Sequence, residues 1–139
     1  MNNDQTMPDF IVIDDDPLNN MICQNIINIT IPHADVKTFT LPEKGLEHIL
    51  HTYTGVETKD LVLFLDINMP VLTGWDVLDQ INDFPAAVRD RLRIFMLSSS
   101  ISSSDKERAE NDPRVSGYII KALSLAKMRA IFNIEGKHT

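Results

Sequence analysis

Four apolar stretches of this 139-residue chain each end in a side chain that can take part in chemistry. A carboxylate directly after an apolar, β-prone stretch has no packing role that would explain it, so Asp66 is a candidate nucleophile. The four stretches with the residues that follow them are Phe10–Ile13 with Asp14, Asp15 and Asp16, Leu61–Leu65 with Asp66, Ile94–Leu97 with Ser98, and Tyr118–Ile120 with Lys121.

The acids would repel one another if the fold brought them together. Two carboxylates about 4 Å apart repel by about 4 kcal/mol at an effective dielectric constant of about 20. Converging acids must therefore protonate or hold a cation. Oxygen donors with no His or Cys nearby in the sequence favour Mg²⁺ or a similar hard ion over zinc. Because Mg²⁺ held by one or two carboxylates also binds phosphate oxygens, the residues predict phosphoryl chemistry.

Each reactive group would have its own role in that chemistry. Asp66 would attack an incoming phosphoryl group and form an aspartyl-phosphate. Lys121 would neutralise one phosphoryl oxygen, and the hydroxyl of Ser98 would donate a hydrogen bond to another.

The elements that must position these groups alternate along the chain. Apolar runs expected to form strands cover about residues 9–14, 35–39, 60–65, 93–98 and 117–120, with segments of helical spacing between them. Strict alternation with right-handed crossovers predicts a doubly wound α/β sheet of five parallel strands and five helices. Ligands of such sheets bind beyond the carboxyl ends of the strands, where all the candidate residues would lie.

The five expected helices have recognisable starts. Asp16 is interpreted as the N-cap of the first helix rather than a metal ligand, because Pro17 follows it at the first helical position. The other helices are expected from Pro42 to about His51, from Gly74 to about Asn82, from a Ser104 and Glu107 capping box, and around Leu125–Phe132.

The first helix carries apolar side chains that recur on one face. They are Leu18, Met21, Ile22, Ile26 and Ile29. The single cysteine, Cys23, lies in the same helix and cannot form an internal disulfide. We expect it to be a small buried residue, with a redox role as the alternative.

Composition limits the function classes. Hydrophobic residues make up 43% of the chain and charged residues 24%, which is ordinary for a compact, water-soluble protein of one domain. No apolar run is long enough for a membrane span, and the amino terminus lacks a signal segment, so a cytoplasmic protein is expected. The net charge of −7 argues against nucleic-acid binding and suits a cation or a basic protein surface.

Four motifs in order resemble the receiver domain of two-component response regulators. They are Ile-Val-Ile-Asp-Asp-Asp-Pro at 11–17, Leu-Phe-Leu-Asp-Ile-Asn-Met-Pro at 63–70 with Gly74, Met-Leu-Ser at 96–98, and Gly-Tyr-Ile-Ile-Lys at 117–121. The resemblance spans about residues 9–134 of a single domain that fills residues 1–139, with no effector domain expected. It implies a flavodoxin-like fold with strand order 2-1-3-4-5, like that of the chemotaxis regulator.

The resemblance also implies residue roles. Asp66 would be the phosphoacceptor and Asp15 a direct Mg²⁺ ligand, with Asp14 as its partner and the backbone carbonyl of Asn68 as a further ligand. Ser98 and Lys121 stand at the positions of the family's hydroxyl residue and lysine. Tyr118 falls at the aromatic position that changes rotamer on phosphorylation, although packing in a strand is an equal alternative.

The chain departs from the family pattern at Ala122, where proline usually follows the lysine, often with a cis peptide. A cis bond before a residue other than proline costs about 2.5–4 kcal/mol, so a trans bond is expected here.

The implied function is a phosphorylation-dependent switch or a phosphate relay, served by a sensor histidine kinase or a phosphotransfer protein. The protein would catalyse its own Mg²⁺-dependent phosphorylation and dephosphorylation without being an enzyme in the usual sense. The polar segment Ser103–Pro113 predicts a weakly anchored fourth helix. The expected surface for a downstream protein is the face of that helix, the fifth strand and the last helix, with Lys106, Arg108, Lys127 and Arg129.

Two other classes remain open. A Mg²⁺-dependent hydrolase of the haloacid-dehalogenase type also uses an aspartate after an apolar strand, but Asn68 stands where its second acid is usual. A pseudo-receiver would share the fold and bind partners without phosphorylation, which the complete set of reactive residues disfavours.

Overall fold

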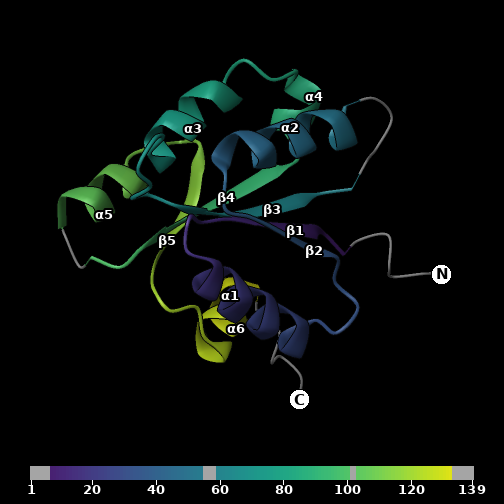
Figure 1. The fold of residues 1–139 in the computed structure, drawn as a ribbon, viewed down its shortest axis with the longest axis vertical. Coiled ribbons are helices and arrows are strands. Elements are labelled where there is room, and N and C mark those ends of the chain that lie inside the picture. Colours follow the sequence, from purple (N-terminus) through teal and green to yellow (C-terminus); the bar gives the residue numbers. More distant parts are fainter. Residues whose placement is uncertain (1–6, 55–58, 101–102, 133–139) are drawn as a thin grey trace.

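A computed structural model describes residues 7–54, 59–100 and 103–132. Five parallel strands form one sheet in the order β2-β1-β3-β4-β5 (Figure 1). The strands are β1 (Asp9–Ile13), β2 (Val36–Phe39), β3 (Leu61–Asp66), β4 (Leu92–Ser98) and β5 (Val115–Ile120). The doubly wound fold and its strand order are therefore confirmed, with strand boundaries within about two residues of those expected.

Helices cover both faces of the sheet (Figure 1). They are α1 (Pro17–Thr30), α2 (Pro42–Tyr53), α3 (Gly74–Ile81), α4 (Ala86–Arg89), α5 (Ser103–Glu110) and α6 (Leu125–Phe132). The short α4 makes six helical segments where five were expected, because a four-residue helix is too short to show a period in the sequence. Within the described residues, no helix is both long and apolar enough to cross a membrane.

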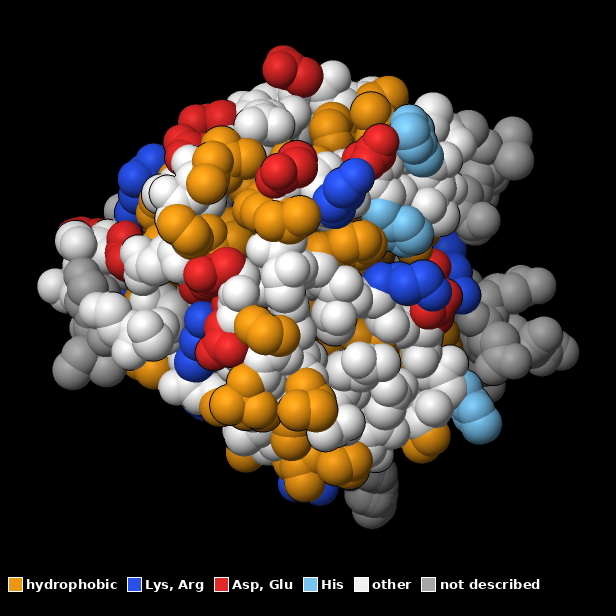
Figure 2. All heavy atoms as spheres, viewed as in Figure 1, with side chains coloured by type: hydrophobic (Ala, Val, Ile, Leu, Met, Phe, Trp, Pro, Cys, Tyr) orange, Lys and Arg blue, Asp and Glu red, His pale blue; other side chains and the backbone are white. Residues whose placement is uncertain are grey.

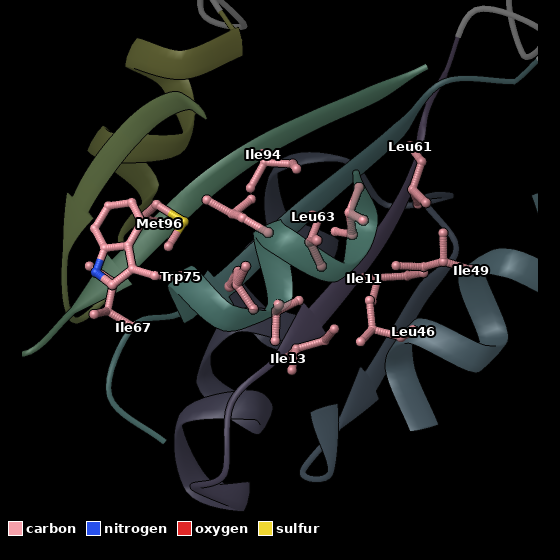
Figure 3. Close-up of a cluster of buried hydrophobic side chains, with 14 of the residues drawn as sticks. Ile11, Ile13, Leu46, Ile49, Leu61, Leu63, Ile67, Trp75, Ile94 and Met96 are labelled. Carbon is pink, nitrogen blue, oxygen red and sulfur yellow. The ribbon is translucent and has the colours of Figure 1, made fainter. Parts of the chain in front are cut away.

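The core has two parts, one on each face of the sheet. Along β1, Ile11 and Ile13 pack under α2 and α3, whereas Phe10 and Val12 pack under α1 and α6. Figure 3 shows the first part, which extends to Trp75 at the start of α3. All six residues of β3 are buried, as expected for a central strand covered on both faces.

Local sequence explains two of the helix starts. Asp16 caps α1, since its Oδ1 accepts a hydrogen bond from the N–H of Leu18 at 3.0 Å, which confirms the predicted cap. Thr73 and Asp76 form a reciprocal capping box at the start of α3. The predicted capping box at Ser104 is wrong, because α5 begins no later than Ser103. In a run of serines, several residues have a similar local preference for the N-cap position, so the sequence does not define where α5 begins.

Helix α1 buries a different face from the one suggested by its apolar spacing. Cys23 and Ile27 are buried together with Asn19 and Asn20. Leu18, Met21 and Ile29 instead have 57%, 53% and 62% of their surface exposed. Hydrophobic side chains gather over α1 and α6 in the lower part of Figure 2. The orientation of α1 about its own axis has a polar cause, because the side chains of both asparagines donate hydrogen bonds to Asp14.

Candidate functional site

Strand register brings the predicted site residues to one edge of the sheet. Ile13 of β1 pairs with Leu65 of β3, so Asp14 and Asp66 follow on adjacent strands. Asp66 in turn pairs with Leu97 of β4, one residue before Ser98. Because all the strands are parallel, their carboxyl ends meet there, which explains how short motifs far apart in the sequence form one site.

Three acids form a compact cluster at this edge. Asp14, Asp15 and Asp66 each offer a carboxylate oxygen, and these oxygens lie within 4.8 Å of one another. Asp14 is fully buried and Asp66 is 2% exposed, whereas Asp15 faces solvent. An all-oxygen donor set with one solvent-facing member fits a hard divalent cation that keeps some of its waters. The donor chemistry therefore agrees with the predicted Mg²⁺.

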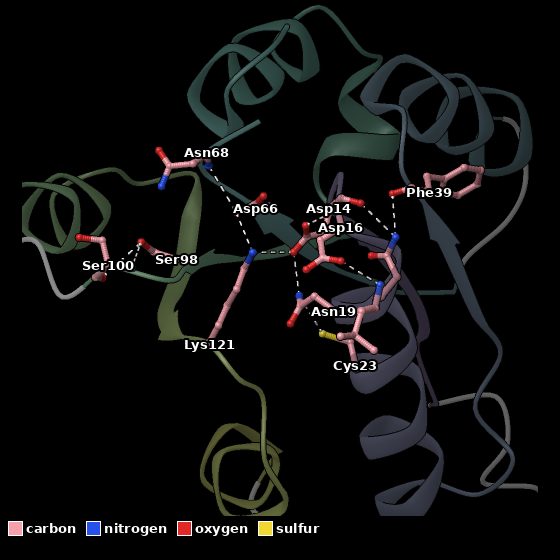
Figure 4. A network of polar contacts seen from close by, with 12 residues as sticks. Asp14, Asp16, Asn19, Cys23, Phe39, Asp66, Asn68, Ser98, Ser100 and Lys121 are labelled. Carbon is pink, nitrogen blue, oxygen red and sulfur yellow. Dashed lines mark hydrogen bonds and ion pairs between the residues drawn. The ribbon is translucent and has the colours of Figure 1, made fainter. Parts of the chain in front are cut away.

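Lys121 lies between the two buried carboxylates (Figure 4). Its Nζ is 2.7 Å from Oδ2 of Asp14 and 3.2 Å from Oδ1 of Asp66. Burial alone would lower the pKa of Lys121, but the hydrogen bond and charge of Asp14 outweigh burial, so the pKa is raised. Lys121 is therefore a fixed positive charge that partly neutralises the acid pair.

The peptide bond between Lys121 and Ala122 is cis, so the predicted trans geometry was wrong. The prediction weighed only the local preference of a residue other than proline. It could not include the contacts that position the chain on both sides of this bond. The N–H of Lys121 donates to the carbonyl of Ser98 at 2.8 Å, and Nζ of Lys127 donates to the carbonyl of Ala122 at 3.0 Å.

The pKa of Asp66 is raised from 3.8 to about 7. Burial is the largest cause and the charge of Asp14 adds to it, while Lys121 and the N–H of Asn68 act in the opposite direction. Near neutral pH the carboxyl group is thus divided between its acid and its carboxylate form. Added positive charge at this edge would favour the carboxylate, which is the nucleophilic form.

We predict that the metal-free protein loses stability as the pH rises from about 5 to about 8. The pKa of Asp66 in the folded state, about 7, lies above its ordinary value of 3.8, so folding favours proton binding. This contribution is present at low pH and is lost as the pH rises through about 7. Urea unfolding in EDTA should show Asp66→Asn to be about 2 kcal/mol more stable than wild type at pH 8. A difference of the same size at pH 5 would contradict the prediction.

Ser98 and Tyr118 share a hydrogen-bond acceptor. Oγ of Ser98, which is fully buried, donates to the carbonyl of Ser100 at 3.3 Å and accepts from its N–H at 3.0 Å. The hydroxyl of Tyr118 donates to the same carbonyl at 3.1 Å. Figure 4 shows the Ser98 hydroxyl turned toward Ser100. The two predicted switch residues are therefore connected through one backbone group.

Sequence reasoning missed two asparagines on the first turn of α1. Nδ2 of Asn19 donates to Oδ2 of Asp14 at 2.7 Å, and Nδ2 of Asn20 donates to the carbonyl of Asp14 at 3.0 Å. Two adjacent polar residues among the apolar positions of a helix could have indicated a buried polar contact. Their partner could not be identified from the sequence.

Cys23 lies beside this network, 3.8 Å from Nδ2 of Asn19. Burial, with the charge of Asp14 second, raises the pKa of its thiol from 9.0 to about 12. A thiol that stays protonated at neutral pH is a poor nucleophile. The expected buried position is thus confirmed, and the chemistry disfavours the redox alternative.

Comparison with known proteins gives the family. Residues 10–133 match the model of the response regulator receiver domain, and the chain belongs to this family. The searched set of curated proteins contains no match.

Solved structures with the same fold include several response regulators. A two-component response regulator from Cytophaga hutchinsonii superposes with a TM-score of 0.81 at 24% identity, over 92% of this chain and 96% of that chain. A response regulator receiver protein from Dyadobacter fermentans gives a TM-score of 0.80 at 28% identity, over 90% and 94% of the two chains. The Vibrio cholerae chemotaxis protein CheY4 is 17% identical, with a TM-score of 0.72 over 93% and 99%.

Proposed function

We propose that this receiver domain accepts a phosphoryl group on Asp66 from the phosphohistidine of a sensor kinase or phosphotransfer protein. The proposal rests mainly on one observation. A single lysine Nζ lies within 3.2 Å of two buried carboxylates, and an exposed third acid completes a cation site beside them. In the proposed function, this arrangement would supply a nucleophile, a set of cation ligands and a fixed positive charge at one edge of the sheet.

The transfer step would use Oδ2 of Asp66. Among the described residues, both hydrogen bonds to the Asp66 carboxylate, from Lys121 and from the N–H of Asn68, end on Oδ1. Oδ2 would attack phosphorus, forming an oxygen–phosphorus bond as the phosphorus–nitrogen bond of the donor breaks. The imidazole nitrogen leaves with the electron pair and takes up a proton. Lys121 and Ser98 would stabilise charge on the phosphoryl oxygens.

Mg²⁺ would be held by Asp15, Asp66 and the backbone carbonyl of Asn68, with Asp14 in support. Its charge would neutralise the repulsion between the carboxylates and the incoming phosphoryl oxygens. The residues themselves supply the rest: burial of Asp66 limits access of water, and Asp14 holds the lysine beside the acceptor before it turns toward the phosphoryl group.

The test is intact mass spectrometry after incubation with acetyl phosphate and Mg²⁺. One phosphoryl group per chain should be gained, and excess EDTA should prevent the gain. Continuous release of inorganic phosphate in step with donor consumption, without a trapped phosphoprotein, would indicate the hydrolase class instead. No gain with any small phosphodonor or with a panel of histidine kinases, under conditions where Mg²⁺ binds, would favour the pseudo-receiver.

The output would pass through the face formed by α5, β5 and α6. Ser98 would turn from the carbonyl of Ser100 toward the phosphoryl group, which releases one of the two donors on that carbonyl and allows Tyr118 to move. A groove of about 500 Å³ on this face includes Tyr118, Ile120 and Ile131 and is flanked by Lys106 and Lys127. We expect a downstream protein to bind there.

Arg108 does not belong to that groove. Its guanidinium lies 4.2 Å from the centre of the Trp75 ring on α3. On α5, Ala109 is the one buried residue of the described helix, so this cation–π contact adds to a small set of contacts that attach α5 to the domain. Arg108 thus connects α5 to the buried ring of Trp75 at the start of α3.

We predict that phosphorylation changes the fluorescence of Trp75 and that Arg108→Met removes at least half of the change. The chain has a single tryptophan, so the tryptophan emission comes from Trp75 alone. Lys106→Met on the same helix is the matched control and should keep the wild-type change. Emission measured before and after acetyl phosphate addition, with equal phosphorylation verified by mass, makes the comparison. An equal response in Arg108→Met would show that α5 does not move relative to Trp75.

A further inference from the structure

Asn19 donates one of the shortest hydrogen bonds in the site. Its Nδ2 lies 2.7 Å from Oδ2 of Asp14, and the side chain is 7% exposed. It reaches the acid from the first turn of α1, a helix that Asp16 caps. A hydrogen bond from an amide to a buried carboxylate is charge-assisted and therefore stronger than a neutral one.

The carboxylate of Asp14 is held on both oxygens. Oδ1 accepts from the N–H of Asp16 at 2.9 Å, and Oδ2 accepts from both Asn19 and Lys121. Donors on two different oxygens prevent rotation of the carboxylate group. Asn20 fixes the backbone of the same residue, since its Nδ2 bridges the carbonyls of Asp14 and Phe39 at 3.0 and 3.3 Å.

The two donors to Oδ2 of Asp14 differ in conformational freedom. Lys121 belongs to a long side chain at the end of β5, and in the proposed transfer it turns toward the phosphoryl group. Asn19 has a short side chain on a capped helix and cannot follow. When Lys121 leaves, Asn19 is therefore the side-chain donor that remains on Asp14.

We propose that Asn19 is a positioning residue, which holds Oδ2 of Asp14 in place while Lys121 moves and so preserves the cation-binding arrangement of the acids. This inference rests on the proposed function. Without Asn19, Asp14 could rotate about its side-chain bond and turn Oδ2 toward Asp66, which would distort the donor set of the cation. Residues that orient the ligands of a metal typically change its affinity by about 10- to 100-fold.

Direct Mg²⁺ binding in Asn19→Leu provides the first test. Leucine keeps the volume and removes the donor. Isothermal titration calorimetry should give a Mg²⁺ Kd about tenfold weaker than wild type. The matched control is Asn28→Leu, because Asn28 lies on the same helix and donates to the carbonyl of Ala34 at 3.2 Å, far from the acids in sequence. The control should lose stability but keep the Mg²⁺ Kd within about twofold.

Equal Mg²⁺ affinity in Asn19→Leu and wild type would overturn the inference and leave Asn19 a merely structural residue. Absence of Mg²⁺ binding in the wild-type protein would instead contradict the proposed function. The two outcomes are distinguishable, because the inference on Asn19 is tested by comparing the variant with a wild-type protein that binds Mg²⁺.

A second measurement needs no variant and covers the case in which Asn19→Leu does not fold. In wild-type protein labelled with ¹⁵N-asparagine, the side-chain amide of Asn19 should exchange slowly with solvent and shift on Mg²⁺ addition. Phosphorylation should leave it protected, because Asn19 stays on Asp14 while Lys121 leaves. Loss of protection on phosphorylation would overturn the inference.

Discussion

Asp66→Asn should lose the gain of a phosphoryl group while remaining folded. The side chain keeps its size and its position at the end of β3, but an amide oxygen does not displace a phosphoryl leaving group under these conditions. The charged form of the buried Asp66 lowers the stability of the folded state near neutral pH, so replacing this carboxylate should not weaken the fold. We expect the rate of phosphoryl transfer from acetyl phosphate to fall by about a thousandfold or more.

The matched control for this variant is Asp16→Asn. Asp16 lies two residues from Asp14 and caps α1, and asparagine caps helices as well as aspartate does. Intact mass after acetyl phosphate treatment should therefore show full phosphorylation of Asp16→Asn and none of Asp66→Asn. Phosphate retained in Asp66→Asn would place the acceptor on another residue.

Lys121→Met should destabilise the metal-free protein strongly. The lysine is the one cation in contact with the buried acids in the described part of the chain, and without it Asp14 and Asp66 face each other without compensation. Removing one partner of a buried ion pair costs about 3–5 kcal/mol. Part of the loss should return on lowering the pH from about 8 to about 5, because the pKa of Asp66, already about 7, rises further without Lys121.

Mg²⁺ should also restore stability to Lys121→Met, since a divalent cation at the acid cluster replaces the missing positive charge. Urea unfolding with and without Mg²⁺ measures both effects, with Lys106→Met, an exposed lysine on α5, as the control. The variant should still bind Mg²⁺ but lose the phosphorylation-dependent change in Trp75 fluorescence. A loss of stability no larger than in the control would show that Lys121 does not compensate the acids.

The sequence alone determined the architecture and predicted which reactive side chains meet at one edge of the sheet. Each apolar run that ends in a reactive side chain forms a parallel strand, and parallel strands deliver their carboxyl ends to one edge whatever their separation in the chain. Asp14, Asp66, Ser98 and Lys121 could therefore be assigned to one edge without coordinates. Local rules also located the Asp16 cap, because N-cap preferences act within a few residues.

Tertiary structure alone decided how these groups are held. The buried face of α1 follows Asn19 and Asn20 rather than the stripe that contains Leu18 and Met21, because contacts with Asp14 outweigh local hydrophobic spacing. The contact of Arg108 with Trp75 joins segments far apart in the sequence, and local preference did not predict the cis bond after Lys121. Periodicity shows which residues can be buried in an element, but long-range partners determine which of them are.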